Sequence, residues 1–255
     1  MEPSLPPSIG EARTPPTSLF ARLTNLFVAP GEVFDEIKAS KRTPANWIVP
    51  LVISVIASVI YTLVVFSQPA VIQRMQEAQG KKFEELVATG KMTQQKADQA
   101  VAAVEKIMSP GFLKILGCLS SVLINAALLF FTALIFWAVG SRALQADFHY
   151  LKAVEAVGIS NMINVVGTIV AMLLAVIYGD MSMTPGPALL IKPFDAANKV
   201  HLMLSALNLF SLWYVGVLSL GLARMTGADF SKTAGWLFGI WAALTFGPIW
   251  LFGGK

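Results

Sequence analysis

The stretch WIVPLVISVIASVIYTLVVF, residues 47–66, contains no charged residue. A helix rises about 1.5 Å per residue, so a stretch of this length can cross roughly 30 Å of bilayer hydrocarbon. Inside hydrocarbon every backbone N–H and C=O must find a partner within its own segment, and a helix provides those partners. The stretch therefore predicts a membrane-spanning helix near 47–66.

Four more stretches of similar length also lack charge. The windows free of Asp, Glu, Lys and Arg are residues 43–73, 115–141, 156–179, 200–223 and 233–254. We place the spans near residues 47–66, 116–139, 157–178, 202–222 and 234–251. A soluble core built by 255 residues could not bury five such helices. The predicted fold class is all-α, a polytopic membrane protein with a bundle of five transmembrane helices.

Composition agrees with a membrane protein and excludes several other classes. Hydrophobic residues make up 55% of the chain and charged residues 13%, against about 25% charged in soluble domains. The net charge of +4 is small and scattered, which argues against nucleic acid as a partner. Cys118 is the one cysteine, and His149 and His201 are the two histidines, so neither a disulfide nor a metal site is expected. No cofactor is predicted.

The polar segments predict short helices around the membrane bundle. Residues 1–18, rich in Pro and Ser, have the composition of a disordered tail. Residues 19–38 have the apolar spacing of two short amphipathic helices, broken at Pro30-Gly31. We expect this pair to lie on the membrane surface or on the bundle, and a partner-docking site is the alternative. The polar insertion 68–110 predicts a helical hairpin that covers the mouth of the bundle.

Small residues recur every four positions in the last predicted span. They are Gly235, Gly239, Ala243 and Gly247. Such a stripe lets another membrane helix approach closely. We expect packing within the chain, and a second copy or another membrane protein is the other candidate partner.

Polar side chains also occur within or beside the spans: Asn125, Asn161, Asn164, His201 and Asn208. Amides in membrane helices usually bond across to neighbouring helices, and that structural role is preferred here. The alternative is a polar path between the helices. Catalytic patterns such as G-x-S-x-G and H-E-x-x-H are absent, so no catalytic residue is predicted. A lipid-modifying enzyme would need a cluster of Asp147, His149 and Glu155, which their spacing does not enforce.

Three stretches resemble the Yip family (Yip-one domain), the Ypt/Rab-interacting membrane proteins. One is LFVAPGEVF at 26–34, and the second is ADFHYLKAV at 146–154. The third begins with LFSLWY at 209–214 and continues through GLARMTG at 221–227 and KTA at 232–234. The likeness covers residues 23–251 and is to the prokaryotic branch, because the eukaryotic Asp-Leu-Tyr-Gly-Pro and Tyr-Gly-Tyr motifs are absent.

The resemblance implies a non-enzymatic scaffold or trafficking-type protein of the membrane. It also implies a cytoplasmic N-terminus and a C-terminus outside, in a prokaryotic cytoplasmic (inner) membrane. Charge alone does not orient the chain, because the 19 basic residues divide nine to ten across the predicted membrane. A small transporter or channel is the alternative function, and the bilayer is the one partner that the sequence specifies.

Overall fold

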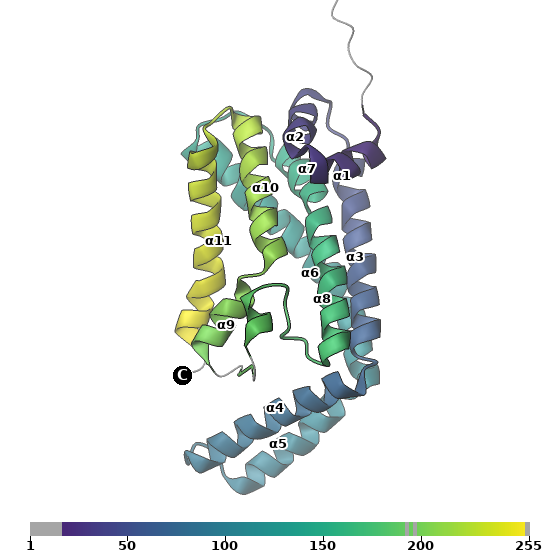
Figure 1. Cartoon of the computed structure of the whole chain (residues 1–255), viewed down its shortest axis with the longest axis vertical. Helices are drawn as coiled ribbons and strands as arrows, with labels where there is room; N and C mark the ends of the chain where they lie inside the picture. The colour runs from purple at the N-terminus through teal and green to yellow at the C-terminus, as the bar shows by residue number, and fades with distance from the viewer. Residues whose placement is uncertain (1–16, 192–193, 196–197, 253–255) are drawn as a thin grey trace, which may run out of the picture.

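The computed structural model describes residues 17–191, 194–195 and 198–252, and this part of the chain is helical without a strand. The predicted disordered tail, residues 1–18, lies outside the described residues except for Thr17 and Ser18. Among these described residues, five helices are long and apolar enough to cross a membrane. They stand side by side as a bundle (Figure 1), which confirms the predicted fold class.

Four of the five spans lie where the uncharged windows predicted them. The first is α3 (Ala45–Val65), and the last is α11 (Phe230–Phe252). The second is α6 (Pro110–Ala138), which continues into the π-helical turn η1 (Val139–Ala143). The third is built from α7 (Tyr150–Ser160) and α8 (Met162–Tyr178), which join at Asn161. This span begins before its uncharged window because α7 carries two charged residues, Lys152 and Glu155.

The fourth span differs from the predicted 202–222. The structure has a short helix α9 (Lys199–Ala206) and then the spanning helix α10 (Leu209–Thr226). The Asn208 side chain accepts a hydrogen bond from the Phe210 N–H at 2.9 Å and so starts a new helix. The preceding loop contains the short 3-10 helix η2 (Pro187–Leu190) and packs closely against the junction between α9 and α10. A Cβ added at Gly186 would lie 2.3 Å from the Leu207 carbonyl oxygen.

The two N-terminal helices pack on one end of the bundle. They are α1 (Leu19–Val28) and α2 (Pro30–Ala39), and α2 lies against α7 and α10. Their apolar residues enter the main core: Leu26, Val33, Phe34 and Ile37 are each at most 1% exposed. The centre of this core is α7, whose residues from Ala153 to Ser160 are all buried. The pair therefore packs on the bundle, and partner docking stays a hypothesis.

The polar insertion forms the predicted helical hairpin at the opposite end. It consists of α4 (Pro69–Ala88) and α5 (Gln94–Ile107), and it lies outside the bundle (Figure 1). Its base is attached to α8 through a small cluster of Val65, Val71 and Ala175. An ion pair between Arg74 and Asp180, 3.1 Å long, lies beside that cluster. The first described helix and the C-terminal end of α11 lie at opposite ends of the bundle (Figure 1).

Candidate functional site

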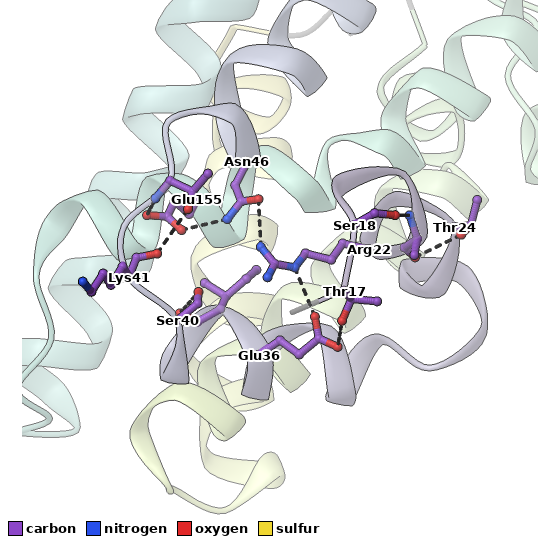
Figure 2. Close-up of polar contacts among 12 residues, drawn as sticks. Thr17, Ser18, Arg22, Thr24, Glu36, Ser40, Lys41, Asn46 and Glu155 are labelled. Atoms are coloured by element: carbon purple, nitrogen blue, oxygen red, sulfur yellow. Dashed lines mark hydrogen bonds and ion pairs between the residues drawn. The ribbon is translucent and has the colours of Figure 1, made fainter. Parts of the chain in front are cut away.

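A buried polar network joins the N-terminal helices to the membrane bundle (Figure 2). Arg22 of α1 donates from Nε to the Glu36 carboxylate of α2 at 3.1 Å and from Nη1 to the Asn46 side-chain oxygen of α3 at 3.3 Å. Asn46 in turn donates to the Glu155 carboxylate of α7 at 2.9 Å. The Thr17 hydroxyl also donates to Glu36. The first three helices and the distant α7 therefore meet through one chain of hydrogen bonds.

Glu155 and Lys152 complete the network on α7. The Glu155 carboxylate accepts from the Thr43 N–H at 3.0 Å and lies 3.5 Å from the Lys152 ammonium. Lys152 also donates to two carbonyls at the end of α2, that of Ile37 at 2.6 Å and that of Ser40 at 2.8 Å. A cation is favoured there because a helix C-terminus carries unpaired carbonyls and partial negative charge. Two cations and two carboxylates thus balance, as burial requires.

Sequence reasoning missed Arg22 and Asn46 as members of this network. Arg22 lies four residues before the buried Leu26, so both fall on one face of α1, and each is buried. A basic residue on the apolar face of an amphipathic helix was the available signal. For Asn46, at the start of α3, the sequence offers no comparable signal, because its partners come from α1 and α7.

A polar cavity of about 390 Å³ lies between the spanning helices. Its walls come from α3, α6, α8, α10 and α11, and its polar lining consists of hydroxyl and amide side chains. These are Ser54, Ser58, Asn125, Thr132, Asn161, Asn164, Thr168, Ser211 and Tyr214. Asn125 donates to the Ser58 hydroxyl at 3.1 Å, and Asn164 donates to the Asn161 side-chain oxygen at 3.0 Å. Ser54 and Ser58 lie four residues apart, so both fall on the face of α3 that lines the cavity.

The cavity collects three of the five polar residues singled out from the sequence. Asn125, Asn161 and Asn164 line it, whereas His201 and Asn208 do not. Asn208 is the N-cap of α10. His201 lies in α9, and its Nδ1 accepts a hydrogen bond from the Asp195 N–H of the preceding loop at 3.0 Å.

The small-residue stripe of α11 faces away from the rest of the bundle. A Cβ added at Gly235, Gly239 or Gly247 would meet no atom within 4 Å among the described residues. The expectation that this stripe packs within the chain is therefore wrong. The helix uses another face: its buried residues are Thr233 and Leu237, and the Thr233 hydroxyl donates to the Ser219 carbonyl of α10 at 2.8 Å. Stripe periodicity cannot show which face of a helix meets its neighbour.

The three residues that a lipid-modifying enzyme would need serve separate roles. His149 caps the N-terminus of α7, accepting from the Leu151 N–H at 3.1 Å, and Asp147 is exposed. Glu155 is buried in the network described above. In the described part of the chain, no hydrogen bond or ion pair joins these side chains, and no three His, Cys, Asp or Glu residues are grouped to hold a metal.

The fold and these features define a polytopic helical membrane protein with an N-terminal helix pair fixed to its bundle. Residues 24–251 match the Yip1 domain, and the chain belongs to that family. The match spans the region from α1 to α11, so the resemblance noted from the sequence is confirmed. No curated protein and no solved structure matches the chain.

Proposed function

We propose that this protein is a non-enzymatic membrane scaffold of the Yip type, which presents its N-terminal helix pair as a rigid platform for a membrane-associated protein. The observation that carries this proposal is the buried network from Arg22 to Glu155, which ties α1 and α2 to α3 and α7. A pair of helices that served only to coat the bundle would need no buried charges, because apolar packing alone would hold it.

The outer face of α1 is free to contact a partner. Phe20 and Val28 lie eight residues apart on α1 and are 77% and 86% exposed, respectively. Thr24 lies between them on the same exposed face. Large apolar side chains held on a rigid helix are typical of docking surfaces. The proposal places this face on the cytoplasmic side of a prokaryotic inner membrane, as the family resemblance implies.

Photo-crosslinking in native membranes tests the platform. A benzophenone amino acid at Phe20 should form protein adducts, and the same group at Ile56 should not, because Ile56 is a half-exposed residue within the span α3. The adduct at Phe20 should weaken with Val28→Ser, which removes the second exposed apolar side chain from the same face. Lipid adducts alone at Phe20 would contradict the scaffold proposal.

A polar path between the helices is the second candidate function, and the cavity is the observation that favours it. Cavities with convergent polar groups between the helices of a bundle are the usual places for small-molecule sites. Proteoliposomes exposed to a glycerol gradient should then change volume faster than empty liposomes, as measured by stopped-flow light scattering. Equal rates would contradict glycerol conduction and would leave the scaffold proposal intact.

A further inference from the structure

The polar cavity lies near the middle of three of the spanning helices. Ser54 is the tenth residue of the 21-residue helix α3, and Asn125 is the sixteenth of the 29 in α6. Trp241, another lining residue, is the twelfth of the 23 residues of α11. At about 1.5 Å per residue, Ser54 lies roughly 15 Å from either end of its helix. The cavity thus lies beside the middle of α3, α6 and α11, and beside the first two turns of α10, where Ser211 and Tyr214 line it.

Several polar atoms of the lining have no protein partner among the described residues. Asn125 uses its amide nitrogen for Ser58 and for the Ser121 carbonyl, and its side-chain oxygen is left over. Asn164 likewise uses its side-chain nitrogen for the Asn161 side-chain oxygen, which leaves the Asn164 oxygen and the Asn161 nitrogen outside that bond. Unpaired amides are costly at this depth, where lipid offers no hydrogen bond. A polar group in the cavity would offer these amides hydrogen bonds that lipid cannot.

The chemistry of the lining restricts the ligand to a neutral group. The described residues that line the cavity include no Asp, Glu, Lys, Arg or His. An ion would lose its hydration at mid-membrane without gaining a counter-charge, so charged ligands are disfavoured. Hydroxyl and amide side chains both donate and accept hydrogen bonds, which matches ligands with several hydroxyl groups. A volume of about 390 Å³ falls at the lower end of the range for small-molecule sites.

The edge of the cavity faces lipid. Ile124 and Leu128 of α6 line it and are 54% and 57% exposed, respectively. On the other side the lining includes Trp241 of α11, a helix that packs mainly on α10 and α9. A ligand can therefore enter sideways, from the bilayer, between α6 and α11.

From these observations we propose that the mid-membrane cavity binds an uncharged, hydroxyl-bearing group, such as the glycerol headgroup of a neutral glyceride, which enters from the bilayer. This binding site does not depend on the scaffold role. None of the residues that line the cavity belongs to the N-terminal network. It also does not require transport, since a cavity open on one side can bind a ligand without releasing it on the other.

Cysteine labelling in nanodiscs tests whether the cavity holds water and ligand. In a Cys118→Ser background, Ser58→Cys and Ser211→Cys each place a thiol in the lining with little change of volume. Ile56→Cys is the matched control, two residues from Ser58 on the same helix but half exposed toward lipid. Because the thiolate forms only where water is present, N-ethylmaleimide should label either cavity cysteine at least tenfold faster than the control. Equal rates for all three variants would overturn a hydrated cavity.

Protection from labelling identifies the ligand class. Mono-oleoylglycerol in the nanodisc should slow labelling of the cavity cysteines at least threefold, and phosphatidic acid at the same fraction should not. Protection by free glycerol as well would support the hydroxyl chemistry, whereas protection by glycerol without the glyceride would overturn sideways entry. Equal protection by phosphatidic acid would overturn the preference for a neutral group. If neither the glyceride nor glycerol protects, the proposed site is refuted, whatever the crosslinking at Phe20 shows.

Discussion

At the scale of single residues, stability depends on how completely each buried charge is paired. The side chain of Glu155 is 2% exposed and receives hydrogen bonds from Thr43 and Asn46 besides its ion pair with Lys152. Asp35 and Arg224 also form an ion pair, but both side chains are about half exposed. Water solvates and screens the Asp35–Arg224 pair. The buried Glu155 carboxylate is shielded from water and depends on its protein partners instead.

Glu155→Gln should therefore destabilise the protein far more than Asp35→Asn. Breaking a buried, fully paired charge costs about 3–5 kcal/mol, and losing an exposed pair costs about 0–1 kcal/mol. Thermal unfolding in detergent, followed by circular dichroism, measures both variants against the unchanged protein. Similar melting temperatures for the two variants would show that the network contributes little to stability.

At the scale of elements, glycines on different helices have different surroundings. A Cβ at Gly158 of α7 would lie 2.6 Å from the Trp47 Cα, which is backbone and cannot turn aside. At Gly239 of α11 a Cβ would meet no described atom within 4 Å. The first glycine allows two helices to touch, and the second leaves an open face.

Alanine at these two positions should have opposite effects on the free energy of unfolding. Gly158→Ala should destabilise by about 1–3 kcal/mol, because the core must shift to admit the methyl group. Gly239→Ala should be neutral or stabilising by up to about 1 kcal/mol, because alanine favours the helix. Thermal unfolding in detergent micelles, where copies are dilute, makes the comparison. A loss of stability for Gly239→Ala would mean that the open face is filled by another helix.

The stability of the bundle should not depend on an intact α4–α5 hairpin. It is attached at its base, and its turn around Gly90 is exposed. A site for a specific protease inserted at Gly90 should allow cleavage with no change in melting temperature. The same site inserted between Arg42 and Thr43 should lower the melting temperature after cleavage, because it separates α2 from the network at Thr43. An equal loss at both sites would show that the hairpin supports the bundle.

At the scale of the whole molecule, an odd number of spans places the two ends of the chain on opposite sides of the membrane. With five spans, a reporter that is active only outside the cytoplasm should be active at one terminus and inactive at the other. Our proposed orientation requires activity at the C-terminus. Activity at the N-terminus alone would reverse the orientation, and equal activity at both would contradict five spans.

Much of the fold could be predicted because hydrocarbon imposes a simple rule. A window without charge and about 20 residues long can cross the bilayer as a helix, and this rule located α3, α6, α8 and α11. The rule misplaced the fourth span because α9 carries no Asp, Glu, Lys or Arg after its first residue, Lys199, so the uncharged window includes most of α9. Two features separate α9 from α10: the Asn208 cap, which is local, and the approach of Gly186 to Leu207, which is a contact between distant segments.

The candidate sites could be predicted only in part. Asparagines stand out in apolar spans, so Asn125, Asn161 and Asn164 were found, but serines and threonines such as Ser54 were not. A serine or threonine in a helix can donate its hydroxyl to a backbone carbonyl of the same helix, as Ser54 does to the Pro50 carbonyl at 2.8 Å. Its presence in an apolar span therefore does not by itself indicate a polar site. Arg22 and Asn46 escaped notice because their partners lie on other helices.

By itself the sequence determined that this chain is a membrane protein with five spans, a polar hairpin and two amphipathic N-terminal helices. Those features follow from local rules, since charge, apolar periodicity and segment length act within each segment. Only the tertiary structure decided that Glu155 meets Asn46, that three asparagines share one cavity and that the stripe of α11 faces outward. These outcomes depend on how each helix is rotated and which helices are neighbours, and both are set by packing between segments distant in the chain.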